Sequence, residues 1–187
     1  MSLRKLNAIL TAAIMLLFLF HIITGSLQLA GIVPGGNMVM KIAAEIMGVA
    51  VLAHALTGAK LTADTLIAQK KSGACGYYKE NRLFWARRIS GFAVLLFMLA
   101  HTSIFAGNNK SGAAFRLNLF DVPQLVCSLL LVLTLLLHIG TNIKPLMNAF
   151  GVSGRSKELS ADIAVIVSVL LLLAGAAFVI YFIRWGG

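Results

Sequence analysis

The fold of this chain is decided by the stretch Leu129–Lys144, LLLVLTLLLHIGTNIK, which is a long apolar run ending in one histidine and, six residues later, a lysine. The same ending, H-x-x-T-x-x-K, closes a second apolar run as HALTGAK at His54–Lys60. Ionisable residues inside apolar helices are costly in a membrane and usually mark a function. The repeated ending therefore suggests that the histidines in the apolar runs have a function.

Composition extends this apolar character to the whole chain: 59% of the 187 residues are hydrophobic, 12% are charged, and the mean hydropathy is +0.92. A bilayer crossing needs about 20 residues, and five runs reach that length, at about 7–32, 38–59, 88–107, 122–143 and 162–184. The first run resembles a signal peptide, but it exceeds a usual h-region and no clear cleavage site follows it. Because the runs lack the alternation of barrel strands, we predict one all-α integral membrane domain, 1–187, with five transmembrane helices.

The basic residues give the orientation of these helices. With the N-terminus inside, twelve of the 16 lysines and arginines lie on the inner side, and the positive-inside rule predicts an N-in, C-out protein of the cell membrane. The net charge of +10 thus reflects topology and not a nucleic-acid partner. The inner residues are Arg4, Lys5, Lys60, Lys70, Lys71, Lys79, Arg82, Arg87, Arg88, Lys144, Arg155 and Lys157; the outer ones are Lys41, Lys110, Arg116 and Arg184.

Each of the first four runs holds one histidine, and the fifth holds none. His54 and His138 each lie six residues before an inner-side lysine, about 9 Å deep at the helical rise. His21 and His101 lie 16 and 13 residues past the inner-side charges that precede them, about 24 and 20 Å deep. The histidines therefore form two pairs at two depths.

Two imidazoles that face each other at one level are suited to bis-histidine haem ligation, whereas zinc needs three or four converging ligands. We therefore predict that the first four helices form a bundle around two haems b, with His21 opposite His101 and His54 opposite His138. A lone histidine can instead hydrogen-bond a neighbouring helix, and a proton relay would ordinarily recruit membrane carboxylates, of which only Glu45 is available. The two cysteines, Cys75 and Cys127, suggest neither a disulfide nor a thiolate metal site.

Polar and small residues extend the predicted haem sites. In the two H-x-x-T-x-x-K endings, Thr57 and Thr141 can bond a backbone carbonyl or a haem propionate, and Lys60 and Lys144 can reach toward propionates or simply snorkel. Small residues ten or eleven positions before the outer histidines would let a helix approach a flat cofactor; these are Thr11, Ser90 and Gly91. Further small residues with the same predicted role, or with an ordinary packing role, are Gly48, Gly58 and Gly140.

These features resemble the five-span, dihaem cytochrome b subunit of succinate dehydrogenases and fumarate reductases. The resemblance covers nearly the whole chain and is most specific in LFWARRISGFAVLLFMLAH (83–101) and LLLVLTLLLHIGTNIKPLMNAFG (129–151). It implies the same histidine pairs, with the outer haem distal to the soluble subunits and the inner haem proximal to them. It also implies electron transfer between flavoprotein and iron–sulfur subunits on the cytoplasmic side and membrane quinone, with menaquinone expected. The dicarboxylate chemistry would belong to the soluble subunits.

The chain departs from that family in two respects. It is shorter than typical members, and Leu136 stands where some members have a glutamate tied to proton movement, so a proton route through this position is not expected. A dihaem cytochrome b subunit of another enzyme, such as a hydrogenase, a formate enzyme or an outward-facing reductase, is the alternative function.

A quinone site is predicted at one end of the haem pair, and Glu45, with Gln28 and Ser26 as polar companions, is its candidate at the outer end. Glu45 precedes His54 by nine residues, about half a turn out of phase, and follows Lys41 by four, which also suits an interfacial ion pair. The alternative quinone site is on the inner side near Arg88 and Trp85. The basic inner connection, about 60–87, is the predicted docking surface for the soluble subunits or for anionic lipid.

Overall fold

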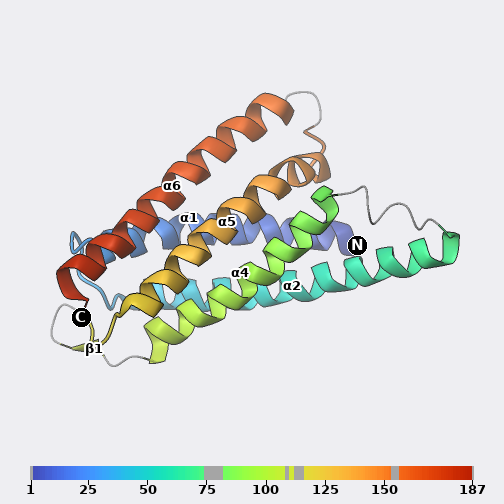
Figure 1. Cartoon of the computed structure of the whole chain (residues 1–187). Coiled ribbons are helices and arrows are strands. Elements are labelled where there is room, and N and C mark those ends of the chain that lie inside the picture. Colours follow the sequence, from blue (N-terminus) through green and yellow to red (C-terminus); the bar gives the residue numbers. More distant parts are fainter. Residues whose placement is uncertain (1, 74–81, 108–109, 112–115, 153–155, 187) are drawn as a thin grey trace.

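The computed structural model describes residues 2–73, 82–107, 110–111, 116–152 and 156–186, which form five long helices and one short β-hairpin (Figure 1). The helices are α1 (Leu3–Leu29), α2 (Met38–Ser72), α4 (Arg82–Gly107), α5 (Val122–Ala149) and α6 (Ser156–Trp185). Between α4 and α5, β1 (Lys110–Ser111) pairs antiparallel with β2 (Arg116–Leu117). All five helices are long and apolar enough to cross a membrane, which confirms the predicted all-α membrane fold.

Three of the helices begin at capping residues that the sequence supplies. Ser2 accepts a hydrogen bond from the Lys5 amide at the start of α1, and Asn37 caps α2 in the same way. At the start of α5, Asp121 and Gln124 form a capping box. These side chains satisfy amide groups that have no partner within the helix, so each helix can start at the edge of an apolar run.

All five helices extend beyond their predicted spans at one end of the bundle, where α1 begins at Leu3 instead of about residue 7. α2 continues to Ser72 and α5 to Ala149, while α4 begins at Arg82 and α6 at Ser156. We call this end the inner end, after the predicted topology, and the opposite end the outer end. Figure 1 shows α2 reaching well past its neighbours at the inner end.

The predicted inner connection of about 60–87 is therefore wrong in its first part, 60–72, and in its last part, 82–87, which are both helical. Residues 60–72 are helical because they are rich in Ala, Leu, Lys and Gln and contain neither Gly nor Pro. Lys70 and Lys71 stand in the last turn of α2, and Gly73, with a positive φ of 69°, is the C-cap residue that follows the helix. Lys79 and Cys75 lie outside the described residues.

The helices pack as two hairpins joined by α6. α1 packs against α2, α4 packs against α5, and α6 lies across α1 and α5. Within the described residues, α1 and α5 make only slight contact, and no comparable packing joins α2 to α4 or α5. The first four helices thus enclose a space between two hairpins, and the fifth spanning helix, α6, closes one side of it.

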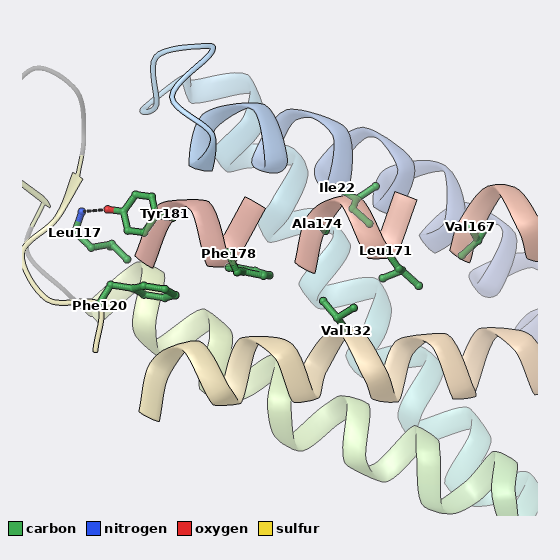
Figure 2. Packing of buried hydrophobic residues seen from close by; sticks show 9 residues of the cluster. All are labelled: Ile22, Leu117, Phe120, Val132, Val167, Leu171, Ala174, Phe178 and Tyr181. Carbon is green, nitrogen blue, oxygen red and sulfur yellow. Dashed lines mark hydrogen bonds between the residues drawn. The ribbon is translucent and has the colours of Figure 1, made fainter. Parts of the chain in front are cut away.

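The apolar core lies on the α6 side of the molecule, between α1, α5 and α6 (Figure 2). At its outer end, Phe120 is 1% exposed, and the Tyr181 hydroxyl accepts a hydrogen bond of 2.8 Å from the Leu117 amide. α2, by contrast, has no buried residue among those described. The core residues drawn in Figure 2 are Ile22, Leu117, Phe120, Val132, Val167, Leu171, Ala174, Phe178 and Tyr181.

Candidate functional site

A cavity of about 2330 Å³ lies between the two hairpins. Its lining runs from Arg4 at the inner end to Trp185 at the outer end and includes residues of all five helices. Pockets for small molecules usually measure about 300–1,000 Å³, so this cavity has room for more than one of them. The four histidines all line it.

The histidines form two pairs across the cavity, and each pair joins one hairpin to the other. His54 of α2 and His138 of α5, the inner pair, have ring centres 6.4 Å apart and planes at 76°. His21 of α1 and His101 of α4, the outer pair, have ring centres 6.3 Å apart and planes at 83°. The structure thus brings together the same two pairs that the depths of the histidines predicted.

The spacing within each pair suits a metal ion bound between the two rings. A nitrogen–metal bond of about 2 Å, with about 1.1 Å from that nitrogen to its ring centre, places two opposed ring centres about 6.2 Å apart. Among the described residues, no group of three or more His, Cys, Asp or Glu side chains is placed to hold one metal ion. Two opposed imidazoles beside a large apolar cavity are the ligand set of a bis-histidine haem, so the residues present fit that group.

Two hydroxyl groups contact the rings of the inner pair. The Thr11 hydroxyl oxygen of α1 lies 3.2 Å from Nδ1 of His54, and the Ser90 hydroxyl oxygen of α4 lies 3.1 Å from Nδ1 of His138. Ser90 is 2% exposed. Thr11 and Ser90, predicted to give a flat cofactor room, thus contact the imidazoles themselves.

Gly91 has a related role beside Ser90. A Cβ atom at this position would lie 3.0 Å from Cε1 and 3.4 Å from Nδ1 of His138, so the absence of a side chain leaves room for that ring. Cβ atoms at Gly48, Gly58 and Gly140 would meet nothing within 4 Å. Gly91 thus makes room for a histidine ring, and the predicted close approach of a helix to a flat cofactor at these four glycines stays a prediction.

The outer pair lies in aromatic surroundings. The His101 ring centre lies 4.7 Å from that of Phe105 and 5.9 Å from that of Phe178. Its Nδ1 is buried and has no hydrogen-bond partner among the described residues. The two pairs therefore differ in chemistry: hydroxyl groups hold the inner rings, while apolar rings surround His101.

The threonines of the H-x-x-T-x-x-K endings bond backbone carbonyls, one of their two predicted partners. Thr57 donates to the His54 carbonyl at 2.9 Å, and Thr141 donates to the His138 carbonyl at 3.1 Å. Thr57 also donates to the Asn7 side chain at 2.7 Å, which ties α2 to α1 below the inner pair.

The lysines of these endings do not line the cavity. Lys60 is exposed and pairs with Asp64 at 3.0 Å, one turn later on α2, and Lys144 is also exposed. The cations that do line the inner end of the cavity are Arg4, Arg87 and Arg88. From the sequence, these arginines were assigned to topology and docking, and Arg88 also to an alternative quinone site, but none of them to haem binding, although two of them stand within one turn of Ser90.

Arg87 and Arg88 are both half-buried, and contacts within the bundle hold them there. The Arg87 side chain donates from Nε to the Thr141 carbonyl at 2.9 Å, joining α4 to α5. The Arg88 guanidinium lies 3.6 Å from the centre of the Phe84 ring. These two arginines, rather than the lysines, are the cations best placed to meet anionic groups in the cavity.

The three candidate quinone residues, Glu45, Gln28 and Ser26, line the outer part of the cavity. Glu45 lies 3.9 Å from Lys41, and the two side chains are 64% and 71% exposed. This is the interfacial ion pair that their spacing also suggested. Gln28 contacts Met40 through its amide nitrogen. The quinone role of these residues stays a prediction.

No protein-family model, curated protein or solved structure matches this chain.

Proposed function

We propose that this chain is a dihaem cytochrome b that carries electrons across the membrane as the anchor subunit of a succinate dehydrogenase or fumarate reductase complex. The proposal is carried by one observation: two histidine pairs bridge the two hairpins, each at a ring spacing suited to a metal ion between them. His21 and His101 would hold the outer haem, and His54 and His138 the inner one. When bound, the haem iron would supply the one-electron chemistry.

The surrounding residues have separate tasks in this proposal. Arg4, Arg87 and Arg88 give the inner end of the cavity a positive charge that suits propionates. The apolar lining around His101 excludes water, which influences a reduction potential through the local dielectric. Lys60 and Lys144 are not needed for either task.

The separation of the two pairs supports an electron path across the bilayer. Thr11, which contacts the inner pair, precedes His21 by ten residues on α1, a rise of about 15 Å. Ser90 precedes His101 by eleven residues on α4, about 16 Å. Because the hydrocarbon core is about 30 Å thick, two centres so spaced divide the crossing into shorter steps.

The inner end of the bundle offers a basic surface on which soluble partner subunits would dock. α2 extends past the other helices there and carries Lys70 and Lys71 in its last turn, so a flavoprotein and an iron–sulfur subunit with acidic surfaces would dock on the cytoplasmic side. The electron acceptor or donor within the membrane would be a quinone, with menaquinone expected, in an N-in, C-out protein of the cell membrane. The alternative is a dihaem subunit of a hydrogenase, a formate enzyme or an outward-facing reductase.

A reduced-minus-oxidised spectrum of the purified chain tests the cytochrome assignment, with two haems per chain expected. His54→Ala and His138→Ala should remove the same haem, and His21→Ala and His101→Ala the other, because each pair shares one metal ion. Absence of an α-band, or loss of one and the same haem in His21→Ala and His54→Ala, would refute the assignment. The soluble subunits that co-purify distinguish the dicarboxylate complex from the alternative.

A further inference from the structure

The hydroxyl groups of Thr11 and Ser90 are already committed as donors to their own helices. Thr11 donates to the Asn7 carbonyl at 2.8 Å, and Ser90 donates to the Arg87 carbonyl at 3.2 Å. A hydroxyl group has a single hydrogen, but its oxygen can also accept. With the hydroxyl hydrogen on the carbonyl, each oxygen is an acceptor toward the histidine that it contacts.

We propose that Thr11 and Ser90 are paired positioning residues that hold the inner histidines with the proton on Nδ1 and the lone pair on Nε2. Nδ1 of His54 and Nδ1 of His138 donate to these oxygens, and Nε2 of each ring is left as the metal ligand. The inference rests on the proposed function, since it assigns the haem-binding atom of each inner ring. It adds two residues, one from each hairpin, that act on the haem through the ring they hold.

The arrangement is specific to the inner pair. Thr11 stands on α1 and acts on α2, whereas Ser90 stands on α4 and acts on α5, so both hairpins contain the same device. In the outer pair, Nδ1 of His101 is buried without such a partner among the described residues. The two haem sites therefore differ in how firmly their ligands are held and in how strongly those ligands donate electrons.

The consequence is a directional effect on the inner haem. A hydrogen bond from Nδ1 increases the basicity of the ligating imidazole, and a more basic ligand favours the oxidised metal. Removing the acceptor should therefore favour the reduced form. We expect Ser90→Ala and Thr11→Val each to raise the reduced-to-oxidised ratio of the inner haem about tenfold at a fixed potential, which is about 59 mV for one electron.

The experiment is a redox titration of the purified full-length chain, followed by its visible spectrum. The His21→Ala variant should contain only the inner haem, so its titration gives the midpoint potential of that haem. Ser90→Thr and Thr11→Ser keep the hydroxyl group and should restore wild-type midpoints. Two control variants remove hydroxyl groups that, among the described residues, bond only carbonyls of their own helix: Ser128→Ala, buried like Ser90, and Thr134→Val, half-buried like Thr11.

An upward shift confined to the inner haem, absent in the controls and reversed by the hydroxyl variants, supports the proposal. If neither Ser90→Ala nor Thr11→Val moves the inner midpoint more than its control does, or if the outer haem shifts equally, the proposal is wrong although the chain still binds two haems. If Ser90→Ala loses the inner haem, the midpoint potential of the inner haem in Thr11→Val is the test. A wild-type chain without haem would instead overturn the proposed function.

Discussion

Replacing Gly91 by alanine is the smallest change that should disturb one histidine pair and leave the other intact. The new Cβ atom would lie 3.0 Å from Cε1 of His138, whereas carbon atoms in good contact are about 3.5–4.0 Å apart. The ring must therefore move by about 0.5 Å or more, or α4 must move away from α5 by a similar distance. Ser90, the preceding residue, would be carried along with any movement of α4.

The magnitude follows from how little displacement a metal site tolerates. Metal–ligand distances are held within about 0.2 Å, so a shift of about 0.5 Å cannot be absorbed without cost. Overpacking by one methyl group costs about 1–3 kcal/mol, which corresponds to a loss of affinity of about 5- to 150-fold. We expect Gly91→Ala to lower the affinity for the inner haem by this factor. Binding of the outer haem should not change, because its proposed ligands lie at the other level.

Haem content and the reduced-minus-oxidised spectrum of the purified chain measure this effect, and competition with an apo-haem-binding protein gives the relative affinity. Gly140→Ala is the matched control, because Gly140 follows His138 by two residues yet its Cβ would meet nothing within 4 Å. Full retention of both haems in Gly91→Ala, or an equal loss in Gly140→Ala, would show that contact with the His138 ring does not limit the site.

Three further variants test other parts of the structure. Glu45→Gln decides between the predicted quinone role and the ion pair with Lys41: a fall in quinol-linked turnover with both haems retained would support the quinone role, and unchanged turnover would leave Glu45 an exposed ion-pair partner. Reversing the charges of Lys70 and Lys71 should weaken co-purification of the soluble subunits without loss of haem, and unchanged co-purification would leave these lysines a topological role alone. Tyr181→Phe should lower the free energy of unfolding by about 1–3 kcal/mol, because the buried Leu117 amide loses its hydrogen-bond partner; an unchanged melting temperature would contradict this.

Hydropathy predicted the five helices correctly but made them too short at the inner end of the bundle. The criterion for a membrane span stops at charged residues, whereas a helix continues as long as its backbone bonds and its residue preferences allow. Residues 60–72 show the difference, because they are polar yet contain no helix breaker. The pair Lys60 and Asp64, four residues apart, was a visible sign of a helix in that stretch.

The pairing of the histidines was predictable because depth in a spanning helix can be counted along the sequence at a fixed rise. The partners of those histidines were not, because counting along one helix does not say which neighbouring helix faces it. Thr11 and Ser90 were therefore predicted only as small residues, ten and eleven positions before the outer histidines, that give a flat cofactor room, and their contacts with His54 and His138 appeared only in the packed bundle.

The spacing of these residues follows from the packing of the two hairpins. α1 supplies a ligand to the outer level and a hydroxyl group to the inner level, and α4 does the same, so the distance from hydroxyl group to histidine along each helix must match the distance between the levels. Eleven residues correspond to about 16 Å and about three full turns, so Ser90 and His101 lie on one face of α4. Ten residues correspond to about 15 Å and leave Thr11 and His21 about 80° apart around α1. Each hairpin thus places a small hydroxyl residue of its first helix beside the histidine of its second helix, and the proposed positioning role of Thr11 and Ser90 rests on these two contacts.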